Sequence, residues 1–118
     1  MINLAIVGYR NYNNYPEFKS YIAKFIEKYG KIDKIISGGA KGTDSMAEIY
    51  ANEHKIPFVC YPADWSKYGK RAGPIRNQLI VNDCTHMVAF LHPDSIGTQD
   101  SINKAKTKNV PTIINFLK

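Results

Sequence analysis

Five short, mainly apolar runs divide the chain, and each is typical of a buried β-strand. Such strands, when separated by helices, form a parallel sheet that helices cover on both faces through right-handed crossovers. We therefore expect one α/β domain over residues 1–118, a single-domain Rossmann-like three-layer sandwich with a parallel sheet of about five strands. The predicted strands are Ile2–Val7, Asp33–Ser37, Ile56–Tyr61, Thr85–Leu91 and Val110–Phe116.

The segments between these runs carry the apolar spacing of amphipathic helices. The clearest helix is predicted from Pro16 to Tyr29, because proline suits a first helical turn and Gly30 suits the stop. A long connection is expected over residues 62–73. The other helices are predicted from the glycine-rich stretch to about His54, from Pro74 onward, and from Thr98 to about Lys108.

The stretch Ser37–Asp44 has the sequence Ser-Gly-Gly-Ala-Lys-Gly-Thr-Asp and joins a predicted strand to a predicted helix. Its glycines allow positive φ and close approach of a ligand, and the helix start offers unpaired N–H groups to an anion. The stretch therefore fits a phosphate cradle. It fits equally a strand-to-helix turn that binds nothing, with Ser45 and Glu48 as a capping box. It matches neither the Walker A loop nor the G-x-G-x-x-G fingerprint.

Four polar loops are expected at one edge of the sheet, where the carboxyl ends of the parallel strands meet. They are residues 8–10, 37–44, 62–77 and 92–98. Ligands of open α/β sheets bind beyond these strand ends, near the point where the strand order reverses. Several glycine-containing, polar loops on one edge favour a ligand site over a set of plain turns.

The charge of the chain favours an anionic partner. With 16 Lys and Arg against 10 Asp and Glu, the formal net charge is +6, which suits a phosphorylated small molecule or nucleic acid. The basic residues are scattered rather than clustered, so nucleic acid is not the expected partner.

Composition also bears on location and metals. No apolar run approaches the ~20 residues of a membrane span, and the first run is too short for a signal peptide. We expect a cytoplasmic protein without membrane contact. Cys60 and Cys84, each beside apolar residues, are expected to be buried free thiols. The three histidines form no metal-ligand spacing with them, so no metal site is expected.

The loop motifs together resemble one family. Pro62-Ala63-Asp64-Trp65, Tyr68-Gly69 and Ala72-Gly73-Pro74-Ile75-Arg76-Asn77 are similar to the signature of the YspA, cpYpsA-related SLOG family. The stretch Gly38–Asp44 and the pair Gly97-Thr98 match further motifs of that family in the same order. The resemblance spans Ile2 to about Phe116. It implies a compact Rossmann-like sheet that binds nucleotides or nucleotide-derived molecules.

The resemblance implies a protein that senses or sequesters a phosphorylated nucleotide derivative, such as an ADP-ribose-type or cyclic nucleotide signal, without a cofactor. Nucleotide N-glycosidase or phosphoribohydrolase activity is the alternative, and a DprA-like DNA-binding module is the second. The hydrolase branch resembles P-G-G-x-G-T-x-x-E, and Ser101 stands at its glutamate position. Asp100 is rotated by about 100° on a helix and is not expected to replace that glutamate. Binding without cleavage is therefore favoured.

Arg76 is the first candidate for a phosphate contact, because a guanidinium can donate two parallel bonds to a phosphate. A surface ion pair is its alternative. Asp44 can accept from ribose hydroxyls or serve the helix start, and a general-base role for Asp64 stays open. Trp65 and Tyr68 can form an aromatic wall or an inter-subunit contact.

A homo-oligomer is expected, and no catalytic residue is assigned. The candidate ligand-binding residues are Gly8, Tyr9, Arg10, Ser37, Gly38, Gly39, Ala40, Lys41, Gly42, Thr43, Asp44, Asp64, Trp65, Arg76, Asn77, Gly97 and Thr98.

Overall fold

Five parallel strands form one sheet in the order β3-β2-β1-β4-β5 in the computed structural model, which describes residues 1–118. The predicted α/β class, the parallel sheet and the number of strands are confirmed. In chain order the elements are β1 (Asn3–Gly8), α1 (Tyr15–Tyr29), β2 (Lys34–Ser37), α2 (Thr43–Glu53), β3 (Phe58–Cys60), α3 (Trp65–Tyr68), the 3₁₀ turn η1 (Gly69–Arg71), α4 (Ala72–Asp83), β4 (His86–Leu91), α5 (Ile96–Thr107) and β5 (Thr112–Phe116).

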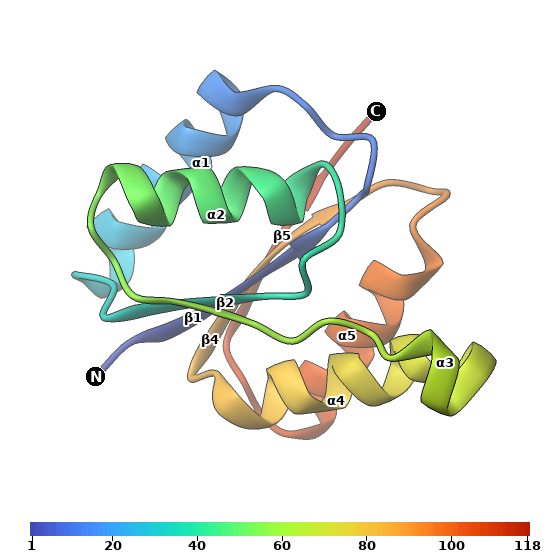
Figure 1. Ribbon diagram of the computed structural model, residues 1–118. Coiled ribbons are helices and arrows are strands. Elements are labelled where there is room, and N and C mark those ends of the chain that lie inside the picture. The colour runs from blue at the N-terminus through green and yellow to red at the C-terminus, as the bar shows by residue number, and fades with distance from the viewer.

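The sheet is the middle of three layers. Helices α1 and α2 cover one face, and α4 and α5 cover the other (Figure 1). Successive residues of a strand point to opposite faces, so Leu4 and Ile6 of β1 pack with the α1 and α2 side chains. Ala5 and Val7 pack on the α4 and α5 side. This alternation explains why the central strands read as continuous apolar runs.

Helix α1 forms where its apolar spacing predicts it. The Asn14 side chain caps it by accepting from the Glu17 N–H at 3.2 Å, and Gly30, with φ +110°, follows its last residue. Phe18, Ile22 and Phe25 are its buried residues. The predicted boundaries are thus confirmed to within one residue.

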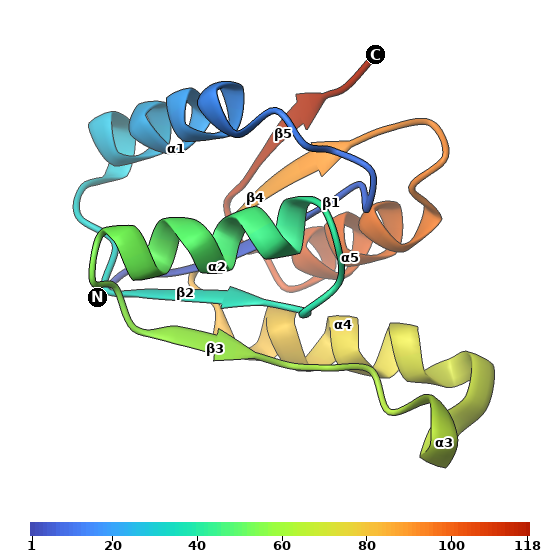
Figure 2. The ribbon, with the colours of Figure 1, turned by 45° about the horizontal axis from the view of Figure 1, so that its top comes forward.

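Other helix starts differ from the prediction. Helix α4 begins at Ala72, two residues before Pro74, and α5 begins at Ile96, two residues before Thr98. First-turn N–H groups have no partner within a helix, so proline is tolerated at several first-turn positions and does not mark the first residue. The connection 62–73 also contains α3 and η1, which project beyond the end of the sheet (Figure 2).

One alternative for the glycine-rich stretch, the capping box, and one prediction about the cysteines are wrong. Helix α2 begins at Thr43 after Gly42, so Ser45 and Glu48 form no capping box; the Ser45 hydroxyl donates to the Ala40 carbonyl at 3.1 Å. Both cysteines are free, but only Cys84 is buried. Cys60 is exposed because β3 is a three-residue strand at the edge of the sheet.

The strand order reverses between β1 and β4. From β1 the chain adds β2 and β3 on one side, and β4 and β5 lie on the other. Gly8 at the end of β1 is paired with Phe90 of β4, so the loops after these two strands leave the sheet side by side and diverge. None of the helices combines the length and the apolar character that a membrane crossing requires.

Candidate functional site

A cavity of about 560 Å³ opens at the carboxyl ends of the strands, at the point where the strand order reverses. All four loops predicted to meet at this edge contribute to its wall. Eleven of the predicted ligand-binding residues line it: Gly8, Tyr9, Arg10, Gly38, Ala40, Asp44, Trp65, Arg76, Asn77, Gly97 and Thr98. The structure thus brings these residues together, and their contact with a ligand stays a prediction.

Six predicted residues lie outside the wall: Ser37, Gly39, Lys41, Gly42, Thr43 and Asp64. Ser37 and Thr43 are fully buried and hold the backbone. The Ser37 hydroxyl donates to the Ile6 carbonyl at 2.8 Å, and the Thr43 hydroxyl donates to the Tyr9 carbonyl at 3.0 Å.

Asp64 is an exposed capping residue. Its carboxylate accepts from the Lys67 N–H at 3.1 Å and from the Ser66 hydroxyl at 2.9 Å at the start of α3. Because it lies outside the cavity wall, the structure provides no support for the general-base role that the sequence left open.

Gly42, at the end of the loop Gly38–Gly42, packs against the loop after β1 without room for a side chain. Gly42 has φ +70° and ψ −118°, and a Cβ there would lie 2.2 Å from the Arg10 carbonyl oxygen. Such a backbone conformation is open almost only to glycine. Glycine at position 42 therefore fixes where α2 begins relative to the end of β1.

Arg76 bridges α4 to this loop. Its Nη1 donates to the Gly38 carbonyl at 2.8 Å, and its Nε donates to the Asn77 Oδ1 at 3.0 Å. The side chain is half-buried and takes part in no ion pair, so the surface ion pair considered from the sequence does not form. A guanidinium has five N–H donors, and those not used in these bonds remain for a ligand.

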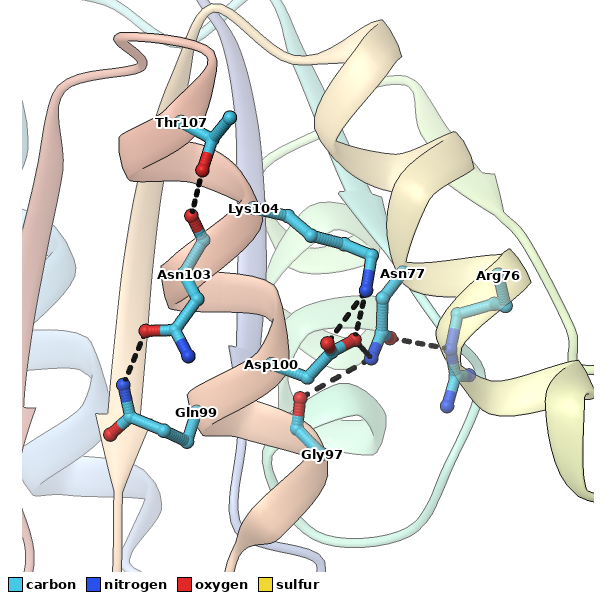
Figure 3. Close-up of polar contacts among 8 residues, drawn as sticks. All are labelled: Arg76, Asn77, Gly97, Gln99, Asp100, Asn103, Lys104 and Thr107. Atoms are coloured by element: carbon cyan, nitrogen blue, oxygen red, sulfur yellow. Dashed lines mark hydrogen bonds and ion pairs between the residues drawn. The ribbon is translucent and has the colours of Figure 1, made fainter.

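A polar chain continues from Arg76 into α5 (Figure 3). Buried Asn77 donates through Nδ2 to the Gly97 carbonyl at 3.3 Å and to Asp100 Oδ2 at 3.0 Å. Lys104 Nζ lies 2.6 Å from both Asp100 oxygens. The start of α4 is thereby joined to the first turns of α5.

Asp100 and Ser101 both line the cavity. Asp100 reaches the wall although its side chain is rotated from that of Ser101, because the cavity extends around the first turns of α5; that it does not replace the glutamate stays a prediction. The Asp100 carboxylate is paired with Lys104 Nζ through both of its oxygens.

The first turn of α5 has no side-chain cap. The Ser95 hydroxyl donates to the His92 carbonyl at 2.7 Å instead, and the N–H groups of Ile96, Gly97 and Thr98 have no acceptor in the protein. Unpaired N–H groups at the positive end of a helix dipole favour an anion. Gly97 and Thr98 lie in the cavity wall.

Asp44 is the buried carboxylate of the cavity. Its Oδ2 accepts from the Ala40 N–H at 3.1 Å. Burial raises the pKa of Asp44 above the ordinary 3.8, and the Ala40 N–H, the Ser37 hydroxyl and the Arg76 charge oppose that rise.

Tyr9 is stacked on His92, with ring centroids 4.0 Å apart and planes 6° from parallel. One face of the Tyr9 ring is therefore covered and cannot stack on a base.

Some wall residues were not predicted. Ser95 and Ile96, the N-cap and the first residue of α5, fall within residues 92–98, which were expected at this edge. Ser101 follows Gly97 by one helical turn and shares its side of α5. This spacing could have identified Ser101. The remaining unpredicted wall residues are Val7, Gly73, Pro74, Ile80, Asp94 and Asp100.

Comparison with known proteins agrees with the motifs. The family model described as "YspA, cpYpsA-related SLOG family" matches residues 2–68. The chain is also 30% identical over 94 residues to the "Gene 61 protein" of Mycobacterium phage D29, a match that covers 75% of this chain and 73% of that protein.

Replacement of Gly42 tests the packing of the two loops. Gly42→Ala should lower the free energy of unfolding by about 1–3 kcal/mol for the backbone conformation and by at least about 1 kcal/mol more for the overlap with the Arg10 carbonyl. Gly69→Ala is the matched control, since Gly69 has φ +58° and ψ −134° but open space around it. Urea unfolding measures both, and equal losses would contradict the packing argument.

The pH dependence of stability tests the buried carboxylate. A folded-state pKa above the unfolded value stabilises the fold at low pH, and that contribution is lost as pH rises through the folded pKa. The difference in unfolding free energy between wild type and Asp44→Asn should therefore fall above pH 3.8, by at most about 1.4 kcal/mol per pH unit, and then level off. Urea unfolding at a series of pH values measures it, and a flat or rising difference would refute the prediction.

Proposed function

The chain belongs to the YspA, cpYpsA-related SLOG family, and from that premise we propose that it binds a phosphorylated nucleotide-derived small molecule in the cavity at the carboxyl ends of the strands. The observation that carries the proposal is the pairing of two kinds of phosphate donor in one cavity wall. The first kind is the set of unpaired backbone N–H groups at the start of α5. The second is the Arg76 guanidinium, which uses only some of its N–H donors in bonds within the protein.

The donors are held before any ligand arrives. Arg76 is tied to the Gly38 carbonyl and to Asn77, and Asn77 is tied to α5. Preorganised donors lose little conformational entropy on binding. An anion bridging Arg76 and α5 would also replace the missing cap of that helix.

We propose a binding role, as a sensor or a sequestering protein, rather than a hydrolytic one. Asp44 is held by the glycine loop, Asp100 is paired with Lys104, and Ser101 stands where the hydrolase branch has glutamate. Asp44 and Asp100 are therefore both engaged by groups of the protein. On the family resemblance alone, we also propose that the ligand is of the ADP-ribose type or a cyclic nucleotide. A homo-oligomer is likewise part of the proposal.

Arg76 variants test the proposed phosphate contact. Arg76→Ala should weaken ADP binding by about 10- to 150-fold, because charge-assisted bonds worth about 1.5–3 kcal/mol are lost. Arg76→Lys should recover only part of the affinity, since an ammonium keeps the charge but loses the fork. Titration calorimetry measures the affinities.

Arg71→Ala is the control, because it removes the same charge from an exposed residue outside the cavity wall. Circular dichroism with urea unfolding separates folding from binding, and Arg76→Ala should cost about 1 kcal/mol through its bond to Gly38. Unchanged ADP affinity in a folded Arg76→Ala protein would remove Arg76 from the site.

Ser101 at the glutamate position, together with the bonds that hold Asp44 and Asp100, predicts that AMP is bound but not cleaved. After long incubation, chromatography should find no adenine above the protein-free control. Adenine release in proportion to protein concentration, abolished by Arg76→Ala, would instead establish N-glycosidase activity in this cavity.

A further inference from the structure

A second cavity, of about 520 Å³, lies on the other side of α5, next to the carboxyl ends of β4 and β5. Its wall is largely apolar and includes Leu91, Ile96, Phe116 and Leu117. Phe116 is 75% exposed and Ile96 is 83% exposed. An exposed aromatic ring beside a concave apolar wall is a surface on which a flat ring can stack.

Two amide side chains of α5 complete this wall, and their arrangement is specific in hydrogen-bonding terms. Gln99 Nε2 donates to Asn103 Oδ1 at 2.9 Å (Figure 3). After this bond the Gln99 carbonyl oxygen and the Asn103 NH₂ group make no other bond within the protein. If the oxygen and nitrogen of both amides are exchanged, one acceptor and one donor again remain free. One free acceptor beside one free donor matches the edge of a nucleobase.

The amide pair alone does not define a site. Gln78 and Asn82 form the same bond, also at 2.9 Å, on α4, outside both cavities. What distinguishes Gln99 and Asn103 is their position in a cavity wall that also contains an exposed phenyl ring.

The two cavities adjoin at the first turn of α5. Ser95, Ile96 and Asp100 belong to both walls. The unpaired N–H groups of Ile96, Gly97 and Thr98 therefore lie between them. A diphosphate placed at this helix end would direct one nucleoside into each cavity, since diphosphates favour the positive end of a helix dipole.

We propose that the second cavity is a nucleobase site and that the ligand is a two-base nucleotide whose phosphates lie across the start of α5. The second base stacks on Phe116 and presents its edge to Gln99 and Asn103. This inference rests on the proposed nucleotide binding in the first cavity and names the class of ligand.

Paired probes test the inference by calorimetry. They are ADP with diadenosine diphosphate, and GDP with diguanosine diphosphate. For at least one base, wild type should bind the two-base probe more tightly than the one-base probe. Phe116→Ala should weaken the two-base probe by about 5- to 150-fold, the range for loss of one stacked base, and leave the one-base probe unchanged.

Gln99→Ala should weaken only the two-base probe, and Gln78→Ala, which removes the matching amide from α4, should change neither. Equal affinity of wild type for both members of each pair, or no effect of Phe116→Ala, would overturn the inference and leave the proposed function intact. Failure of wild type to bind any of the four probes would refute the proposed nucleotide binding, and this inference with it.

Light scattering tests the competing occupant. A wild-type dimer that Phe116→Ala dissociates would assign the cavity to a second copy of the chain and overturn the inference. A Phe116→Ala protein with the same mass as wild type, together with the loss in two-base affinity, supports it.

Discussion

The contact between the loop after β1 and the glycine loop after β2 is the constraint on which the site depends. Three groups make it: Gly42 lies against the Arg10 carbonyl, Thr43 donates to the Tyr9 carbonyl, and the Gly8 backbone lies close to Thr43. Parallel strands provide only a common edge, and this contact brings two loops into one wall. Thr43 is also the first residue of α2. The contact therefore determines the position of the cavity wall and the position at which α2 begins.

The same loop then positions the helices on the other face of the sheet. Gly38 has no side chain where the Arg76 guanidinium approaches; a Cβ there would lie 2.3 Å from Arg76 Nη1. Arg76 in turn holds Asn77, and Asn77 holds both Gly97 and Asp100. One connected set of hydrogen bonds thus spans the glycine loop, α4 and α5. Each of these buried or half-buried polar groups has a partner, which is the condition under which such a network adds rigidity rather than cost.

The sequence predicts the strands and α1 well, because a central parallel strand is apolar on both faces and α1 has a regular apolar stripe and a cap. It also predicts which loops share an edge, since connectivity alone decides that. It does not predict the exact helix starts at Ala72 and Ile96, where first-turn residues tolerate both Pro74 and Thr98. Nor does the sequence distinguish residues that line the cavity from residues that hold the backbone in place. Ser37 and Thr43 belong to the glycine-rich stretch, yet their hydroxyls donate to backbone carbonyls and do not line the cavity. The sequence also does not predict that Asp100 lines the cavity, because that depends on the shape of the cavity and not on residue spacing along one helix.

The start of α5 lacks the side-chain cap that would stabilise it locally, although a serine stands at the N-cap position. A serine at the N-cap position normally accepts from the second or third helical N–H, and losing such a cap costs about 1 kcal/mol. Ser95 instead bonds both polar backbone groups of His92 and so closes the loop after β4. Asn14 and Asp64 cap α1 and α3 with their side chains, whereas α2 and α4 begin without a side-chain cap, as α5 does. Departures of this kind concentrate at functional sites, where a ligand supplies what the local sequence omits. The uncapped end lies between two cavities of different character, one with Arg76 and one with Phe116, so an anion placed there would complete the helix and join the two cavities at the same point.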